Sequence, residues 1–366
     1  MSSTEVSIIH SLSLNSEKFV GGVETWLRDY LSHCALPTRV LGVLEIGLPP
    51  VVQRGLKQQG LVITSIDRTR TVPPHLFALA VGMFRHRAKI RGDIQVHRPE
   101  LAVFVRLLKP TSRIVLVLHT NLAVQRTFRP DSRWRLYGWL FPLIERIAVR
   151  SSTLVLAYAG ADQARLLKNY PNVIVGNSWC SDSFFDQARS PSVSRSAGFI
   201  WAGRFELVKD PLLCLRAFAE SAHLHSRCLS FIGSGTMKRQ LIREIQELKL
   251  EKRGRVVGPA TEKEMAEALA TSLALVQTSH FEGAPRILVE AIASGAPIIA
   301  AAENDPEGLS VNPHYGIRVQ TRSSADYAEA LAEIAKNPFR ADSSQLQNRR
   351  ASRQIPLLEA KLHPTT

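Results

Sequence analysis

The chain has 366 residues, too many for one ordinary hydrophobic core and suited to two domains of about 150–200 residues each. Its 45% hydrophobic and 21% charged residues are typical of a globular protein and argue against disorder. The net charge of +14 is uneven: from Arg85 to Arg150 there are 14 Lys and Arg but 4 acids, which favours an anionic partner such as a membrane, nucleic acid or phosphorylated substrate.

The start of the chain leads directly into a predicted strand, Val6–His10, without the basic and then apolar pattern of a secretion signal. Apolar runs such as Ile114–Leu118 are far shorter than the roughly 18–20 residues of a membrane-spanning helix. The cysteines have neither CxxC spacing nor a neighbouring His cluster, which indicates buried thiols in a reducing compartment. We therefore expect a cytoplasmic protein, or one on the cytoplasmic face of a membrane. The cysteines are Cys34, Cys180, Cys214 and Cys228.

Short β-branched strands alternate with helix-length amphipathic segments along the whole chain. This alternation predicts an α/β protein with two parallel sheets and helices on both faces of each sheet. In the first half the predicted strands are Val6–His10, Val40–Leu44, Leu61–Ile66, Ile94–His97, Arg113–His119, Thr153–Ala157 and Val173–Gly176. In the second half they are Gly198–Ala202, Cys228–Ile232, Arg255–Gly258, Leu273–Gln277 and Pro297–Ala301.

A polar stretch, Gln187–Ala197, separates the two halves and is typical of a linker. We expect an N-terminal domain over residues 1–185, a linker over 186–197 and a C-terminal domain over 198–345. The remaining residues, 346–366, form a C-terminal tail that can return to the N-terminal domain.

Cations, glycines and acids follow the strands of the second half. The loops in question are Gly203–Lys209 after the first of these strands, Gly233–Gly235 after the second and Ser279–Pro285 after the fourth. In an open parallel sheet, ligands bind beyond the carboxyl ends of the strands. Arg204 and Lys209 can supply charge-assisted hydrogen bonds to phosphate oxygens. The glycines at 233 and 235 allow the backbone to approach a ligand closely.

The helix after the fourth of these strands adds an anion site and two acids. Pro285 suits the first turn of that helix, so the N–H groups near residues 284–287 would face an anion. Glu282 lies just before the helix, and Glu290 lies four residues after Arg286, on the same helix face. Taken alone, Glu290 could simply be a surface partner of Arg286. Together, the two carboxylates can accept hydrogen bonds from hydroxyls at opposite ends of a nucleotide sugar.

These motifs resemble those of the retaining glycosyltransferases of family 4 over roughly residues 198–302. The resemblance lies in Glu282-x7-Glu290, in Gly203-Arg204-x4-Lys209, and in Gly233-Ser234-Gly235 followed by Lys238. It implies the GT-B fold, in which two Rossmann-like domains face each other across a cleft, with the acceptor on the side of the N-terminal domain. It also implies that Arg204 and Lys209 hold the diphosphate, that Glu282 contacts the transferred sugar and that Glu290 holds the ribose. The donor site would further include Gly203, Gly233, Gly235, Gly283 and Ala284.

The first half resembles the family less closely. Gly21 and Gly22 follow the first strand as the family's glycine loop does, near the donor phosphate and the acceptor. His119 ends a strand, as the family's cleft histidine does, and joins Glu282 and the two cations as a candidate catalytic residue. His97 is a further candidate. The family's hinge motif and its last acid-bearing loop are altered here, to Asn177-Ser178-Trp179-Cys180 and Glu303-Asn304-Asp305-Pro306-Glu307-Gly308.

The resemblance implies transfer of a hexose-type sugar from a nucleotide-diphosphate sugar with retention of configuration. No Asp-x-Asp motif occurs, so we expect no metal and no cofactor; Arg204, Lys209 and the helix N-terminus would neutralise the diphosphate instead. Alternatives are a soluble acceptor, a sugar-nucleotide epimerase or a catalytically silent sugar-nucleotide binder. A nucleic-acid-binding protein would explain the charge, but the basic segment lacks the interleaved aromatics of a recognisable module, and we expect no nucleic acid.

The segment Arg126–Arg150 mixes arginines with aromatic residues, a composition typical of segments that lie at a membrane interface. The aromatic residues are Trp134, Tyr137, Trp139 and Phe141. A core helix with a solvated basic face is the alternative. We predict that residues 85–150 attach the protein to an anionic membrane surface and that the acceptor is a lipid-linked glycan in bacterial-type surface polysaccharide assembly.

Overall fold

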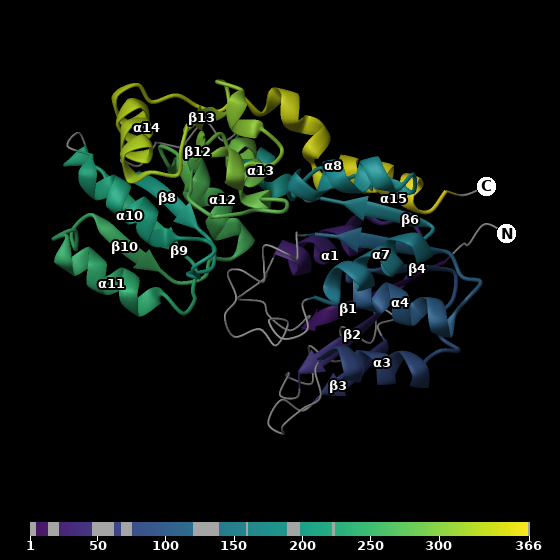
Figure 1. Cartoon of the computed structure of the whole chain (residues 1–366). Helices are drawn as coiled ribbons and strands as arrows, with labels where there is room; N and C mark the ends of the chain where they lie inside the picture. Colours follow the sequence, from purple (N-terminus) through teal and green to yellow (C-terminus); the bar gives the residue numbers. More distant parts are fainter. Residues whose placement is uncertain are drawn as a thin grey trace. The chain divides into compact units, whose positions relative to one another are not determined.

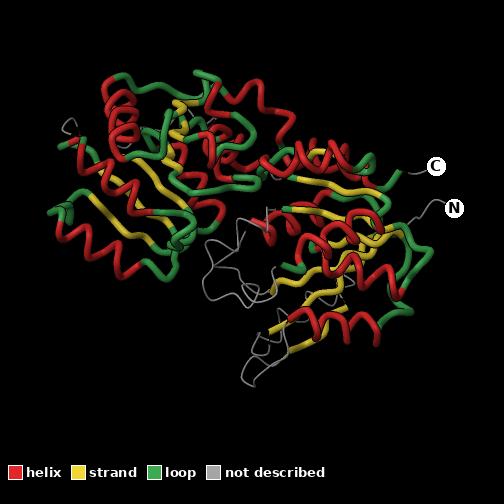
Figure 2. The backbone as a smooth tube through the Cα atoms, in the orientation of Figure 1, coloured by secondary structure: helices red, strands yellow, loops and turns green. Residues whose placement is uncertain are grey.

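The computed structural model describes residues 5–13, 22–45, 62–66, 75–119, 139–158, 160–188, 198–221 and 224–364. The chain divides into two compact units. Unit 1 consists of Met1–Gly176 together with Ile355–Thr366, and unit 2 consists of Asn177–Gln354. Each unit is a parallel sheet with helices packed against it (Figures 1 and 2).

Unit 1 contains, in its described part, a seven-stranded parallel sheet with the order β3-β2-β1-β4-β5-β6-β7. Its strands are β1 (Val6–Ser13), β2 (Thr38–Glu45), β3 (Val62–Ile66), β4 (Asp93–Val96), β5 (Ile114–Leu118), β6 (Leu154–Ala157) and β7 (Val173–Val175). Its helices are α1 (Gly22–His33), α3 (His75–Arg85), α4 (Pro99–Leu108), α7 (Phe141–Ser151) and α8 (Gly160–Asn169). All five residues of β5 are buried, as expected for a strand in the middle of a sheet that is covered on both faces.

Unit 2 contains a six-stranded parallel sheet with the order β10-β9-β8-β11-β12-β13, counted over its described residues. Its strands are β8 (Gly198–Ala202), β9 (Cys228–Ile232), β10 (Gly254–Val257), β11 (Leu275–Gln277), β12 (Ile298–Ala300) and β13 (Gly316–Arg318). Its helices are α9 (Asp182–Ala188), α10 (Pro211–Glu220), α11 (Lys238–Glu247), α12 (Glu262–Thr271), α13 (Arg286–Ala293) and α14 (Ser324–Lys336). Short 3-10 helices η2 (Ala302–Asn304), η3 (Leu309–Val311) and η4 (Ser343–Arg349) complete it.

The central strand of unit 2 separates two hydrophobic cores. Phe199 and Trp201 of β8 pack into one core, whereas Ile200 and Ala202 pack into the other. Successive side chains of a strand point to opposite faces, so both faces of this sheet are covered. A covered parallel sheet leaves the ends of its strands as the place where polar side chains can gather.

The last helix, α15 (Ala351–Leu362), begins in unit 2 and ends in unit 1. Within unit 1, the carboxylate of Glu359 accepts hydrogen bonds from the backbone N–H groups of Ala35 and Leu36 at 2.8 and 3.0 Å. Arg113 donates to the backbone oxygen of Leu362 at 2.9 Å. These contacts join the C-terminal residues to the sheet of unit 1.

Each of the twelve expected strands has a counterpart, so the predicted α/β class with two parallel sheets is confirmed. The three-residue strand β13 was not expected, because it is defined by its pairing with β12 and not by an apolar run of its own. Unit 1 gives way to unit 2 at Gly176, ahead of the expected linker. Residues 186–188 of that linker end α9, and its remainder, 189–197, lies outside the described residues.

Candidate functional site

The strand order of unit 2 reverses between β8 and β11, and this reversal brings two polar loops together. Arg204 and Lys209 lie in the loop that follows β8, and Glu282 lies in the loop that follows β11. Open α/β sheets bind ligands at such a switch point, beyond the carboxyl ends of the strands. Three residues expected to bind a donor are therefore supplied by the two loops that flank this position.

Glu282 is a buried carboxylate surrounded by hydrogen-bond donors. The residue is 8% exposed, and the ammonium of Lys209 lies 2.5 and 2.7 Å from its two carboxylate oxygens. Gln277 donates to Oε1 at 2.5 Å, and the hydroxyl of Ser279 donates to the same oxygen at 2.6 Å. A buried charge is tolerated only when it is paired and hydrogen-bonded, and Glu282 is both.

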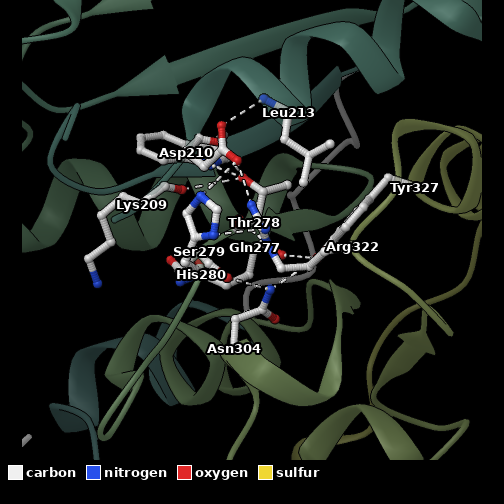
Figure 3. Close-up of polar contacts among 11 residues, drawn as sticks. Lys209, Asp210, Leu213, Gln277, Thr278, Ser279, His280, Asn304, Arg322 and Tyr327 are labelled. Carbon is white, nitrogen blue, oxygen red and sulfur yellow. Dashed lines mark hydrogen bonds and ion pairs between the residues drawn. The ribbon is translucent and has the colours of Figure 1, made fainter. Parts of the chain in front are cut away.

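A second group of contacts holds the Lys209 loop against the loop after β11. Figure 3 shows Asp210, His280 and Arg322 converging beside Thr278. The Thr278 hydroxyl donates to the backbone oxygen of Asp210 at 2.7 Å, and the His280 N–H donates to the backbone oxygen of Val208 at 2.9 Å. Asp210 has the left-handed φ of 47° and caps the N-terminus of α10. The position of Lys209 is thus fixed from both sides of the switch point.

His280 has the hydrogen-bond pattern of a neutral ring. Arg322 can only donate, so Nδ1 of His280 accepts its hydrogen bond at 2.9 Å and the proton is left on Nε2, 3.4 Å from the carboxylate of Asp210. Burial lowers the pKa of His280, and the positive charge of Arg322 lowers it further, while Asp210 acts in the opposite direction. The ring therefore links Asp210 and Arg322 without adding a charge.

Asn304 and Tyr327 form hydrogen bonds to the backbone of β11 and of the loop after it. Asn304 donates to the backbone oxygen of Ser279 at 3.2 Å and to the hydroxyl of Tyr327 at 3.0 Å, and that hydroxyl donates to the backbone oxygen of Gln277 at 2.7 Å. Both side chains are fully buried. Sequence reasoning did not find these residues, nor Asp210, Gln277, His280 and Arg322. Asp210 before Pro211 carried a helix-start signal, whereas Arg322 is brought in only by the fold.

Arg204 differs from Lys209 in having no partner for its charge. The side chain is half-buried, and within the described part of the chain its guanidinium makes no hydrogen bond or ion pair. An Arg guanidinium carries five N–H donors that match the oxygens of a phosphate group. At this position Arg204 is available to an anionic ligand without breaking a hydrogen bond or ion pair to any described residue.

The glycines at 233 and 235 have close backbone neighbours inside unit 2. A Cβ atom on Gly233 would lie 2.0 Å from the backbone oxygen of Gly203, and one on Gly235 would lie 2.4 Å from that of Phe205. The Phe205 N–H donates to the backbone oxygen of Ser234 at 2.8 Å. The glycines therefore let the loops after β8 and β9 approach each other, which holds the loop that carries Arg204. Their expected role beside a ligand stays a prediction.

The helix after Glu282 begins one residue later than expected. Pro285 is the residue before the first turn of α13, which starts at Arg286, and not a member of that turn. Gly283 and Ala284 lie in the connecting loop, where the N–H of Arg286 donates to the backbone oxygen of Ala284 at 2.9 Å. Glu290 lies 3.8 Å from Arg286, as their spacing of four residues on one helix face predicts.

The two segments in which the sequence departs from the family's motifs, 177–180 and 303–308, contact each other. Glu307 accepts hydrogen bonds from the N–H of Ser178 at 2.8 Å and from Arg349 at 2.7 Å, and Arg349 also donates to the backbone oxygen of Ser178. Asp305 accepts from the N–H groups of Leu309 and Ser310. Both carboxylates thus accept hydrogen bonds from backbone N–H groups of unit 2 and stabilise its loops.

In unit 1, two of the expected site residues lie side by side at the ends of neighbouring strands. His119 follows β5 and is half-buried, and His97 follows β4 and is buried. Nδ1 of His97 lies 2.7 Å from Nε2 of His119. Gly22 is the first residue of α1, and Gly21 lies outside the described residues.

The basic segment is described only in part, because residues 120–138 lie outside the described residues. In α7, Leu143 and Ile147 are 54% and 44% exposed, one helical turn apart, and Trp139 ahead of the helix is 73% exposed. Arg146 and Arg150 of the same helix are exposed as well. These residues present apolar and basic groups to the surface together.

Further expectations concern metal ligands, membrane-spanning helices and cysteines among the described residues. They include no group of three His, Cys, Asp or Glu side chains placed to hold a metal ion. No helix among them is long and apolar enough to cross a membrane. All four cysteines are free thiols; Cys180 and Cys214 are buried, whereas Cys34 and Cys228 are only partly buried, so the expectation of burial is wrong for these two.

Comparison with known proteins places a glycosyltransferase family domain in unit 2. Residues 182–353, just under half of the chain, match the family described as Glycosyl transferases group 1. A D-inositol 3-phosphate glycosyltransferase of Nocardioides sp. is 28% identical over 211 residues, which cover 53% of this chain and 46% of that protein. The chain therefore spans about half the length of this curated relative.

Solved structures resemble this chain over almost its full length. HepE of Anabaena in complex with UDP and glucose has a TM-score of 0.65 at 15% identity and covers 98% of this chain and 95% of its own. The apo form of the lipopolysaccharide outer core galactosyltransferase WaaB has a TM-score of 0.69 at 14% identity and covers 97% and 98%. At these identities the likeness establishes the fold, and the predicted GT-B fold is confirmed.

Proposed function

We propose that this protein is a retaining glycosyltransferase of family 4 that takes a hexose-type sugar from a nucleotide-diphosphate sugar. The observation that carries the proposal is the pairing of Lys209 with Glu282 at the switch point of unit 2, with Arg204 in the same loop as Lys209, inside the domain that matches group 1 glycosyl transferases. Two cations suit the two phosphates of a sugar nucleotide, and a buried carboxylate suits the hydroxyls of its sugar. The complex of HepE with UDP and glucose supports a uridine nucleotide as the first donor to test.

The roles of the three residues follow from their contacts. Arg204, which has no partner in the described residues, binds a phosphate through its guanidinium fork. Lys209 uses two of its three N–H groups on Glu282 and directs the third to the diphosphate. Glu282 accepts a hydrogen bond from a hydroxyl of the sugar, and Glu290 accepts one from a hydroxyl of the ribose. Gly203, Gly283 and Ala284 supply backbone beside these groups.

The reaction replaces one bond at the anomeric carbon by another on the same face. The bond from that carbon to the phosphate oxygen breaks, and a bond to the acceptor oxygen forms. The acceptor's proton passes to the leaving diphosphate. Arg204 and Lys209 stabilise the negative charge that develops on the diphosphate, in place of a metal ion, and the protein otherwise acts by positioning the two substrates. His119 of unit 1 is the further catalytic residue that we propose.

The acceptor we propose is a lipid-linked glycan of surface polysaccharide assembly, bound by a protein that lies on the cytoplasmic face of a membrane. The exposed apolar and basic residues of α7 support this proposal, because such a surface suits an anionic bilayer. WaaB, which is named for a galactosyl transfer to the lipopolysaccharide outer core, supports the same class of acceptor.

The test compares UDP, GDP and ADP as ligands in thermal unfolding, followed by release of the nucleotide from the corresponding sugar nucleotides. A ligand at 100 times its dissociation constant stabilises the native protein by about 2.7 kcal/mol. We expect one nucleotide to raise the unfolding temperature of the parent and to raise that of Arg204→Ala much less. If no nucleotide stabilises the parent and none is released from any sugar donor in the presence of a lipid extract, the proposal is wrong.

A further inference from the structure

A line of buried polar side chains runs along β4 toward His119. Asp93, Gln95 and His97 alternate along the chain with two apolar residues, so they share one face of the strand. Their exposed fractions are 6%, 0% and 7%. The fourth member is His363, which follows α15 and is 3% exposed. Among these residues and His119, the sequence analysis assigned a role only to His97 and His119.

Four hydrogen bonds join these residues into a continuous chain. Nδ1 of His363 lies 2.8 Å from Oδ2 of Asp93, and its Nε2 lies 3.3 Å from Oε1 of Gln95. Nε2 of Gln95 lies 3.0 Å from Nε2 of His97. Nδ1 of His97 lies 2.7 Å from Nε2 of His119. All five residues belong to unit 1.

Donors and acceptors in this chain must alternate, and one complete pattern follows from the orientation of the Gln95 amide. Its oxygen accepts from Nε2 of His363, whose Nδ1 donates to Asp93, so His363 carries two protons. The amide nitrogen then donates to Nε2 of His97, and Nδ1 of His97 donates to Nε2 of His119. A neutral His119 ring must therefore carry its own proton on Nδ1.

A second complete pattern follows when His363 has lost one proton. Its Nε2 is then an acceptor, so the Gln95 amide turns and presents its nitrogen to His363 and its oxygen to His97. Nε2 of His97 now donates, its Nδ1 accepts, and Nε2 of His119 becomes the donor. A neutral His119 ring carries its proton on Nε2, and its Nδ1 becomes an acceptor.

We propose that His363 is a positioning residue for His119, and that the protonation state of His363 selects which nitrogen of the neutral His119 ring carries the proton. Nδ1 of His119 is a donor when His363 carries two protons and an acceptor when it carries one. Only the effect of His363 on the rate of sugar transfer rests on the proposed function. The choice of tautomer is a property of unit 1 alone.

Aromatic contacts restrict the movement of the His119 ring, so that the proton and not the ring changes place. The ring lies 7° from the plane of Tyr158 with centroids 5.7 Å apart, and the edge of Trp26 meets it at 81°. Trp26 in turn donates from its indole N–H to the hydroxyl of Tyr158 at 2.9 Å. The planes of His97 and His119 lie within 12° of each other, which suits a hydrogen bond between ring nitrogens.

The charged and titratable groups near His363 come from four elements. Arg113, ahead of β5, lies 3.2 Å from the carboxylate of Asp93. Glu359 of α15 accepts from the backbone after α1, and the phenol of Tyr30 on α1 has a pKa that burial raises. Asp93 on β4 therefore balances the charge of Arg113 and, when present, that of a doubly protonated His363.

The test observes the nitrogen signals of His119 by NMR in protein labelled with ¹⁵N-histidine, with His119→Gln used for assignment. Protonated and unprotonated ring nitrogens give well-separated signals. In the parent, we expect the proton of His119 to move from Nε2 to Nδ1 as acidification protonates His363. In His363→Gln, whose amide can donate to Asp93 and accept from Gln95 but cannot gain a proton, it stays on Nε2. In Gln95→Leu the chain is cut, and both tautomers appear together.

Glu359→Gln is the matched control, because it weakens the attachment of the same helix without interrupting the chain of hydrogen bonds, and it should give the parent's His119 signals. The proposal is overturned if His119 responds to pH in His363→Gln as it does in the parent, or if all variants give the same tautomer at every pH. Under the proposed function, His363→Gln has the parent's kcat at neutral pH, where both proteins keep the His119 proton on Nε2, and lacks the roughly tenfold change in kcat that the parent shows as acidification protonates His363. A protein that transfers no sugar but shows the expected NMR signals would refute the function and leave this inference standing.

Discussion

The ammonium of Lys209 lies within 2.7 Å of both carboxylate oxygens of Glu282, although the two residues are 73 positions apart in the chain. Each neutralises the other at a place where the carboxylate is almost fully buried. A ligand that binds Lys209 through its third N–H therefore also acts on Glu282, because the ammonium is shared between them. The two residues form one binding group rather than two separate contacts.

The first prediction separates the contribution of this pair to stability from its contribution to sugar transfer. Lys209→Met leaves Glu282 with its hydrogen bonds from Gln277 and Ser279 but without a counter-charge. We expect the free energy of unfolding to fall by about 1.5–3 kcal/mol and sugar transfer to fall by at least about 10–100-fold. Adding Glu282→Leu should restore part of the stability and none of the activity. Urea unfolding and initial rates measure both, with Lys252→Met, at an exposed turn, as the control.

Near-parental turnover in Lys209→Met would contradict the assignment of the pair to the donor site. A double variant less stable than both single variants would show that the pair is not the main reason for the stability loss.

The second prediction concerns Arg204, whose side chain has no partner in the described residues. Because its loss removes no hydrogen bond or ion pair among the described residues, Arg204→Ala should change the free energy of unfolding by no more than about 0.5 kcal/mol. Loss of charge-assisted hydrogen bonds to the donor should lower kcat/KM by about 10–100-fold. Thermal unfolding with and without nucleotide checks both, and Arg216→Ala, which loses only a surface ion pair with Glu244, is the matched control. Arg204→Ala with an undiminished response to nucleotide would remove Arg204 from the site.

The expected strands and the loops with Arg204, Lys209 and Glu282 could be predicted because each depends on a local pattern, an apolar run followed by polar residues. The pairing of Lys209 with Glu282 could not, since it depends on which strands become neighbours. Arg322 and His363 carried no local signal; they reach Asp210 and Gln95 only through the fold. The contacts of Gly233 and Gly235 with the loop after β8 could not be predicted, because a sequence does not show which other loop lies close to a glycine.

The third prediction concerns metal. The proposed site holds the diphosphate with Arg204 and Lys209, and neither can act as a ligand of a divalent cation while protonated. We expect sugar transfer to keep its full rate in excess EDTA and to be unchanged by added Mg²⁺ or Mn²⁺. A rate that EDTA abolishes and a divalent cation restores would mean that the diphosphate is neutralised in another way.

The fourth prediction is a pH dependence of stability that arises from His280. The folded state lowers the pKa of His280 below its ordinary value of 6.5, so between the two values the unfolded chain binds more protons. The contribution of His280 to stability is therefore fully present above pH 6.5 and is lost as the pH falls through the lowered pKa. His280→Gln should show a shallower loss of unfolding free energy over this range. His314→Gln, in an exposed position, should retain the parent's slope; equal slopes in all three proteins would contradict the assignment.

The last prediction concerns the surface of α7. Leu143 and Ile147 are exposed one turn apart, and Arg146 and Arg150 are exposed on the same helix. An anionic bilayer attracts each nearby Lys or Arg by about 1 kcal/mol, and this attraction is screened by salt, whereas the burial of apolar side chains is not. We therefore expect the protein to float with anionic liposomes at low salt, to bind them less at high salt and not to bind neutral liposomes. Arg146→Glu/Arg150→Glu should abolish the dependence on lipid charge, and Leu143→Ser/Ile147→Ser should weaken binding at every salt concentration. Leu167→Ser, on the exposed side of α8, is the apolar control. Equal and negligible binding to both kinds of liposome would leave a protein that acts on a soluble acceptor.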